Sequence, residues 1–115
     1  MTILKNSSKH SKKMAIILPN GYKMQTTFFN DFAIADAFGI TAIEDTFKRS
    51  FNEWKDNIVY ITEMAIVMSN KSIAWYSKGN DVYSKMYTDY YHKIDEYVMN
   101  HFKGKDLEFY FKVTD

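Results

Sequence analysis

The sequence predicts an α+β fold that is mainly α: a bundle of three to four helices carrying a small antiparallel sheet. Three observations support this class. The chain of 115 residues contains one proline and four glycines, so few positions interrupt a helix. Apolar residues recur with the 3.6-residue period of amphipathic helices through the middle of the chain. Both ends carry strand signals, which predicts a sheet made from an N-terminal hairpin and a C-terminal strand.

The N-terminal part divides into a basic tail and a predicted hairpin. Residues 1–13 contain four lysines and no acid and lack periodicity, so we expect a flexible basic tail before a single globular domain over 14–115. Met14 is a second candidate for the true start, and the sequence leaves this open. An apolar run over 14–18 and an alternating stretch over 22–27 flank Asn20–Gly21, a turn signal because both residues tolerate positive φ.

Two predicted helices follow the hairpin. Asn30 or Asp31 caps the first, which runs to Phe38 and ends at Gly39, a residue suited to a left-handed position. A capping box over Thr41–Glu44 opens the second, whose apolar residues recur every three or four positions along one stripe. The residues of that stripe are Ile43, Phe47, Phe51 and Trp54.

Two longer helices are predicted over about 58–78 and 82–102, and Asp56–Asn57 and Asn80–Asp81 supply their caps. The first is apolar on most sides, which predicts a central position. Residues 107–113 then alternate, with Leu107, Phe109, Phe111 and Val113 on one side, the pattern of a half-buried strand. Because a lone strand needs a partner, we expect it to pair with the N-terminal hairpin.

Composition excludes several functional classes. The chain has no cysteine, which excludes disulfides, thiolate metal sites and a thiol nucleophile. No apolar run is long enough for a signal peptide or a membrane span, so we expect a soluble protein located in the cytoplasm, without membrane contact. The net charge of +1 is unevenly distributed along the chain. Outside the tail there are eleven basic and fourteen acidic residues, and this slightly acidic body is a poor electrostatic match for nucleic acid.

No catalytic motif is recognisable, so we expect no enzyme activity, no cofactor and no metal. Asp89, His92 and Glu96 lie on one helix face and could ligate a metal, but the helical di-iron pattern needs this motif twice. A solvated polar face is the simpler interpretation of these three residues. The serines lie outside any nucleophile elbow, and four scattered glycines make no phosphate-binding loop.

A tyrosine-rich surface on the helix over 82–102 is the candidate binding face, because tyrosine is enriched at interfaces. We predict that a protein partner contacts Tyr83, Tyr87 and Tyr91 together with two acidic residues, Asp36 and Asp45. Tyr91 is the best single candidate, since Tyr90 before it lies on the core stripe. Two alternatives stay open: the tyrosines lie at the rim of the core, and the acids serve as helix caps or first-turn residues.

Two stretches, 26–39 (TTFFNDFAIADAFG) and 45–55 (DTFKRSFNEWK), resemble small proteins carried by phages and mobile elements of Gram-positive bacteria. The turn over 103–108 and the ending over 113–115 are also similar, so the resemblance covers most of 26–115 and excludes the tail. It assigns no functional residue. It implies a setting in which small cysteine-free proteins bind a host or defence protein, as anti-CRISPR proteins do.

These observations favour a non-enzymatic, protein-binding accessory protein of a phage or mobile element, which acts stoichiometrically and could inhibit a host defence system. One alternative is a nucleic-acid-associated accessory protein whose basic tail contacts phosphates. Another is a small enzyme with a metal at His92. The sequence names neither the partner nor the oligomeric state.

Overall fold

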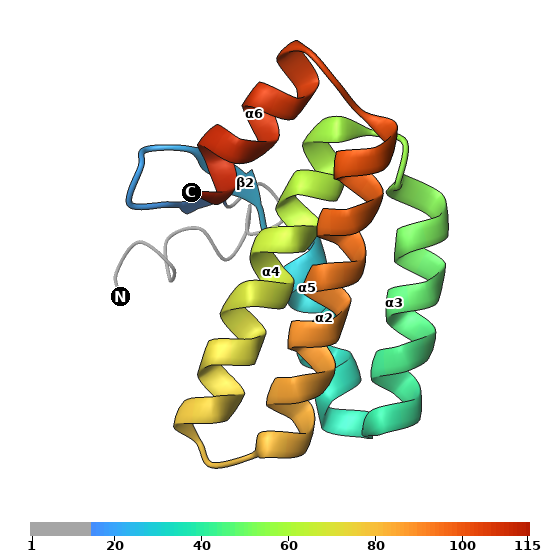
Figure 1. The fold of residues 1–115 in the computed structure, drawn as a ribbon. Coiled ribbons are helices and arrows are strands. Elements are labelled where there is room, and N and C mark those ends of the chain that lie inside the picture. Colours follow the sequence, from blue (N-terminus) through green and yellow to red (C-terminus); the bar gives the residue numbers. More distant parts are fainter. Residues whose placement is uncertain (1–14) are drawn as a thin grey trace, which may run out of the picture.

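The computed structural model describes residues 15–115, and helices form most of this part of the chain (Figure 1). The described residues form one hairpin and five helices. The strands are β1 (Ala15–Ile17) and β2 (Lys23–Gln25), and the helices are α2 (Thr27–Phe38), α3 (Ile40–Trp54), α4 (Ile58–Ser77), α5 (Asp81–His101) and α6 (Lys105–Thr114). The prediction of a mainly helical fold with a small antiparallel sheet is confirmed, whereas the basic tail over 1–13 lies outside the described residues.

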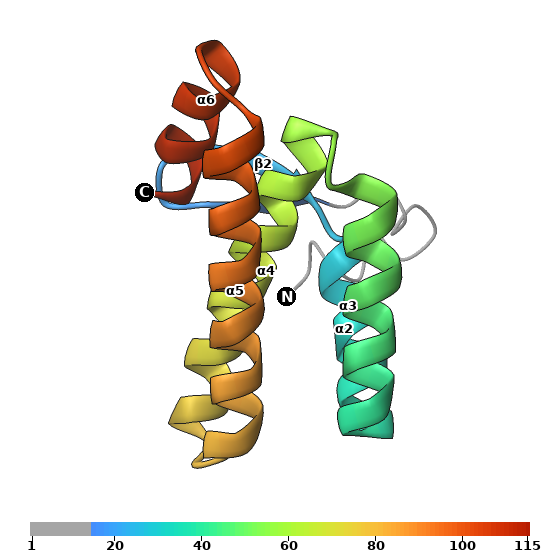
Figure 2. The same cartoon turned by 45° about the vertical axis from the view of Figure 1, so that its right-hand side comes forward.

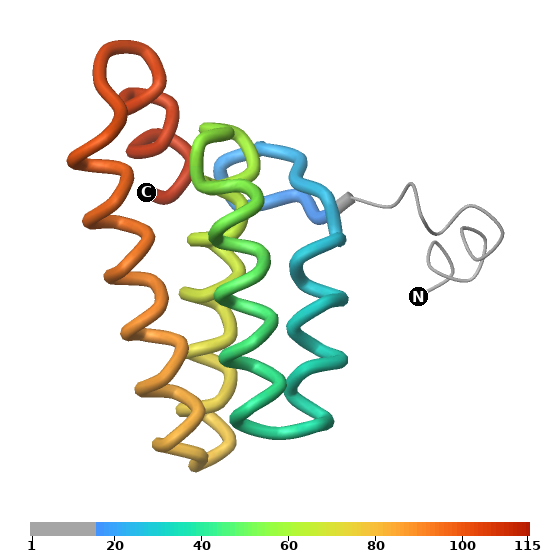
Figure 3. The backbone as a smooth tube through the Cα atoms, turned by 90° about the vertical axis from the view of Figure 1, so that its right-hand side faces the viewer, coloured from blue at the N-terminus to red at the C-terminus, as the bar shows by residue number. Residues whose placement is uncertain are grey.

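The helices form two antiparallel pairs, α2 with α3 and α4 with α5, which lie side by side in Figures 2 and 3. Helix α4 contacts each of the other four helices, so it is the central element that the sequence predicted. Its residues Ile61 to Met68 are all at most 8% exposed. Helix α6 turns back over one end of the bundle beside the hairpin, and α2 lies at the outer edge of its pair (Figure 3).

Helix starts follow the predicted caps in two cases out of four. The predicted cap at Asn30 or Asp31 is wrong, because α2 already begins at Thr27, after Thr26, which makes no side-chain cap hydrogen bond. The side chain of Asn57 accepts hydrogen bonds from two backbone N–H groups of α4 at 3.1 Å, and Asn80 does the same for one N–H group of α5 at 3.0 Å. The capping box over Thr41–Glu44 is wrong. Helix α3 begins one residue earlier, directly after Gly39, without a side-chain cap. The φ of Gly39 is 113°, which lets α2 and α3 meet in a very tight turn.

The predicted N-terminal hairpin is confirmed. Strand β1 pairs antiparallel with β2, with Ile16 opposite Met24, and the turn between them contains Gly21 at a φ of 90°. Met24 is only 1% exposed and attaches the hairpin to the bundle. The side-chain amide of Asn20 donates to the carbonyls of Lys112 and Val113 at 3.4 and 3.2 Å, so the hairpin loop also contacts the last helix.

The predicted C-terminal strand is wrong, because residues 105–114 form helix α6. The buried residues are Tyr110 and Val113, which are 0% and 6% exposed and three positions apart, as a helix requires. Phe111, predicted to face the core, is 46% exposed. Within the described residues the sheet therefore has two strands, and the bundle has one helix more than the upper limit of the prediction.

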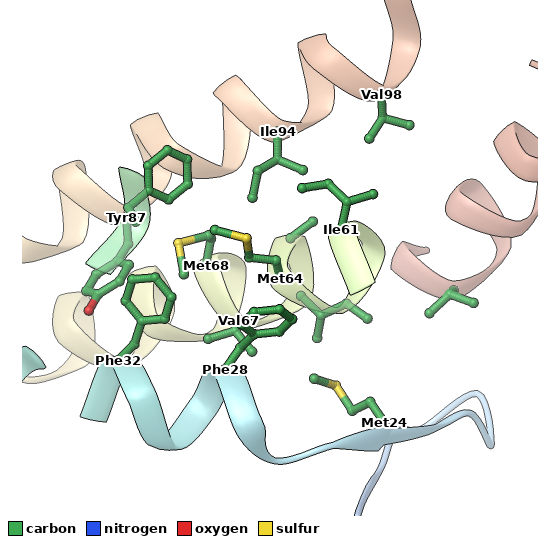
Figure 4. Packing of buried hydrophobic residues seen from close by; sticks show 14 of the residues in the cluster. Met24, Phe28, Phe32, Ile61, Met64, Val67, Met68, Tyr87, Ile94 and Val98 are labelled. Carbon is green, nitrogen blue, oxygen red and sulfur yellow. The ribbon is translucent and has the colours of Figure 1, made fainter. Parts of the chain in front are cut away.

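The core lies where α2, α4 and α5 meet. Figure 4 shows Phe28 and Phe32 of α2 directed at Met64 and Met68 of α4, with side chains of α5 on the far side. All four are at most 4% exposed. Burial of each such side chain stabilises the fold by about 1.5–3 kcal/mol, so this region supplies most of the apolar stabilisation.

Candidate functional site

Within residues 15–115, the outer side of α2 is an uncovered apolar surface. Phe38 is 79% exposed and Ile34 is 60% exposed, one helical turn apart, and Ile40 at the start of α3 is 51% exposed. The alanines beside them on α2, Ala33 and Ala37, are also exposed. We call Ile34, Phe38 and Ile40 the open face of α2. A helix that is apolar on both its inner and its outer side is normally buried, yet α2 is covered on one side only.

Helix α2 itself carries negative charge. Helix α2 contains two acids and no base, and its last turn, where the helix dipole places partial negative charge, has no basic residue. On α3, Asp45 is exposed, whereas Glu44 lies 3.7 Å from Lys48. Of the two acids on α2, Asp36 is neutralised internally by Lys71, which leaves Asp31 as the acid on the outer part of this helix.

Asp36 belongs to a buried polar cluster and does not form part of a surface. Its Oδ2 atom lies 2.8 Å from Nζ of Lys71, and the two side chains are 9% and 13% exposed. Tyr87 donates its hydroxyl to Oδ1 of Asp36, and the indole N–H of Trp75 donates to Oδ2 at 3.4 Å. Burial and the Asp36 carboxylate raise the pKa of Tyr87. The cluster ties α2 to both α4 and α5.

The five residues of the predicted binding face therefore do not share one surface. Tyr87 is 0% exposed, and Asp36 is its partner inside the fold, so the placement of these two on a binding surface is corrected. Tyr83 is half-buried against Trp75, with ring centroids 4.9 Å apart. Asp45 is exposed on a different helix.

Tyr91 is half-buried rather than fully outward. It lines a surface hollow of about 470 Å³ together with the hairpin loop and the end of α6, and it packs against the core at its inner edge. Burial and the charge of Asp95 raise its pKa. Of the five predicted residues, Tyr91 is the tyrosine that borders an open hollow.

Glu63 is a second buried carboxylate, on the side of α4 that faces the hairpin. It is 2% exposed. Its Oε2 atom accepts a hydrogen bond from the Tyr22 hydroxyl at 2.8 Å, and its Oε1 atom accepts one from the backbone N–H of Gln25 at 3.2 Å. Burial raises the pKa of Glu63, and burial together with Glu63 raises the pKa of Tyr22 to about 12. Glu63 thus attaches β2 to the bundle.

An open cleft of about 490 Å³ borders Glu63. Its walls come from β2 and from the first turns of α4, and its lining residues include Lys23, Asn57 and Tyr60. In the sequence, Glu63 is a single acid inside the apolar run 58–68. A lone carboxylate among core positions is itself a signal of a specific site, because burying a charge is costly unless it is paired or hydrogen-bonded.

The predicted alternative of a metal at His92 gains no geometric support. Asp89, His92 and Glu96 are exposed on α5, and Asp89 lies 3.2 Å from Lys85. Within residues 15–115, His, Asp and Glu side chains form no group of three that is placed to hold a metal ion. In the same range, no helix combines the length and the apolar character needed to cross a bilayer.

Comparisons with protein-family models, with curated proteins and with solved structures gave no match to the chain.

Proposed function

We propose that the chain is a non-enzymatic accessory protein that binds a protein partner stoichiometrically through the open face of α2. One observation carries this proposal: the outer side of α2 presents Ile34 and Phe38, which are 60% and 79% exposed, and Ile40 at the start of α3 is 51% exposed. Large apolar side chains gathered on one exposed face mark interaction sites in soluble proteins.

The open face contributes little to folding. A Phe side chain that is 79% exposed has lost only a small part of its contact with water, so most of the 1.5–3 kcal/mol available from burying a Phe remains for an interface, by the usual estimate of about 25 cal/mol per Å². Ala33 and Ala37 add little bulk, so a partner helix can approach the α2 backbone closely.

The partner surface that fits is an amphipathic helix whose polar side is basic. Its apolar side would cover Ile34 and Phe38, and its Lys or Arg residues would face Asp31 and the C-terminal end of α2. The resemblance to proteins of phages and mobile elements supplies the setting, which is inhibition of a host defence protein in the manner of anti-CRISPR proteins.

A displayed library of helical peptides tests this proposal without knowledge of the partner. Half of the library combines an apolar side with basic residues, and half combines the same apolar side with acidic residues. We expect the protein to enrich the basic half, with binding that weakens as salt increases. The variant Phe38→Asp should lose this binding, whereas Ile73→Asp, at a 63% exposed position on α4, should keep it.

Three results would overturn the proposal: no enrichment, equal enrichment of both halves, or binding that survives Phe38→Asp. Sedimentation of the free protein completes the test. A dimer of the wild type that Phe38→Asp converts to a monomer would show that the open face is covered by a second copy, which contradicts a heterologous partner.

A further inference from the structure

A small hollow beside Glu63 is lined mainly by aromatic side chains. Its volume is about 100 Å³, far below the roughly 300–1,000 Å³ of sites for drug-sized ligands. The lining residues come from four elements or their junctions: Gln25, Thr27, Phe28, Trp54, Tyr60 and Glu63. The space corresponds to about three water molecules at roughly 30 Å³ each, so it suits one compact head group.

Three aromatic rings form its walls. The ring of Tyr60 stands at 76° to the ring of Trp54, with centroids 4.5 Å apart, and at 81° to the ring of Phe28, with centroids 6.3 Å apart. Phe28 lies in the first turn of α2, Trp54 ends α3 and Tyr60 lies in the first turn of α4, so three helices each contribute one ring. Rings attract cations through their quadrupole.

The Glu63 carboxylate is the fourth wall, and it differs from the other buried carboxylate of the fold. Asp36 has Lys71 at 2.8 Å, whereas Glu63 has, within residues 15–115, two neutral hydrogen-bond donors and no Lys, Arg or His within 4.0 Å. Burying an ionised carboxylate without a neighbouring cation costs free energy of folding. A cation in the hollow would relieve this cost.

We propose that this hollow binds the ammonium group of an alkylated amine, with Phe28, Trp54 and Tyr60 as an aromatic cage and Glu63 as the counter-ion. An alkylated nitrogen suits the cage better than a free Lys ammonium, which is compact and strongly hydrated. The neighbouring cleft of about 490 Å³ shares Gln25, Tyr60 and Glu63 with the hollow and has room for the chain that carries the ammonium.

This inference is independent of the open face of α2. Two sources of the ligand share the required chemistry: a methylated Lys side chain of a protein, and a free choline-type amine. Both present a methylated cationic nitrogen on a flexible chain.

The test uses ¹⁵N-labelled protein and the indole N–H signals of its two tryptophans. Tetramethylammonium should shift the Trp54 signal saturably in the millimolar range. Trp75 is an internal control, because Lys78 already lies 5.1 Å from its ring centroid and it does not line the hollow. Choline should bind at least about tenfold more tightly than 3,3-dimethylbutan-1-ol, its uncharged carbon isostere, since the cation contributes on the order of a factor of ten.

Substitutions of the lining residues test the contribution of each wall to binding. Glu63→Gln keeps the shape of the side chain, removes its charge and should weaken binding about tenfold. Tyr60→Phe should bind nearly as the wild type does, and Tyr60→Ala should lose binding. No shift of Trp54, equal binding of the uncharged isostere, or equal affinity of Glu63→Gln would overturn the proposal. The comparison of choline with its uncharged isostere uses the wild-type protein, so it tests the ammonium site even if a variant fails to fold.

The same titration identifies the source of the ligand. If N-acetyl-trimethyllysine amide binds more tightly than choline, the natural ligand is a modified Lys side chain. If choline binds more tightly, the ligand is a free amine. Either order supports an ammonium site. The peptide library that tests the open face contains no alkylated amine, so failure of one proposal leaves the other intact.

Discussion

Substitutions at two adjacent residues of α6 give a sharp test of the last helix. Tyr110 is 0% exposed, and its hydroxyl donates to Oδ1 of Asp95 at 3.0 Å. Tyr110→Ala therefore removes a fully buried ring, a loss of about 3–5 kcal/mol out of the roughly 5–15 kcal/mol expected for a domain of this size. Tyr110→Phe removes only the hydrogen bond to a carboxylate, a loss of about 1.5–3 kcal/mol.

Phe111→Ala is the matched control. Phe111 is 46% exposed, so its truncation should cost about half of the burial free energy of a Phe, on the order of 1 kcal/mol. Urea denaturation followed by far-ultraviolet circular dichroism measures all three free energies of unfolding. In a strand over 107–113, Phe111 would face the core and Tyr110 would face away. A loss at Phe111 as large as that of Tyr110→Ala would refute the helical phase of α6.

Two further predictions concern the buried carboxylates. Burial raises the pKa of Glu63 above its ordinary value of 4.5, so the folded state favours the protonated form. The stabilisation that this shift contributes is complete below pH 4.5, and it is lost as the pH rises through the pKa of the folded state. Urea denaturation should therefore show Glu63→Gln gaining stability relative to the wild type from acidic to neutral pH, and a constant difference would contradict this sign. Lys71→Met leaves Asp36 buried without its cation and should cost about 3–5 kcal/mol, whereas the double variant with Asp36→Asn should cost less than the sum of the two single changes, as measured by a thermal-unfolding double-mutant cycle. Additive losses would mean that the two side chains do not interact.

Local patterns predicted most of the fold. The caps at Asn57 and Asn80 and the hairpin turn at Asn20–Gly21 each depend on a few adjacent residues, and the structure confirms all three. The prediction of a strand over 107–113 was wrong because seven residues are too few to distinguish an apolar period of 2 residues from one of 3.6 residues. The helical form buries Tyr110 and lets its hydroxyl donate to Asp95 on α5, a contact that no local pattern reveals.

The candidate sites were less predictable for the same physical reason. Asp36 and Lys71 are 35 positions apart, and only the packing of α2 against α4 shows that they form a pair. The sequence pattern assigned Tyr83, Tyr87 and Tyr91 to one candidate binding face, yet Tyr87 is inside the fold and Tyr91 borders a hollow. Glu63 was visible as an acid in an apolar run, but its aromatic neighbours come from two other helices and a neighbouring turn.

The methionines of the core have a mechanical consequence for α2. Met64 and Met68, both 0% exposed, lie against Phe28 and Phe32 on the inner side of this helix. Unbranched thioether side chains adapt their torsions to irregular gaps more readily than branched side chains do. A displacement of α2 is therefore accommodated more easily by this layer than by a layer of Ile and Val. Pressure on the outer side of α2 from a bound partner would be absorbed by these two side chains. Helix α2 therefore rests on a compliant layer of α4 side chains.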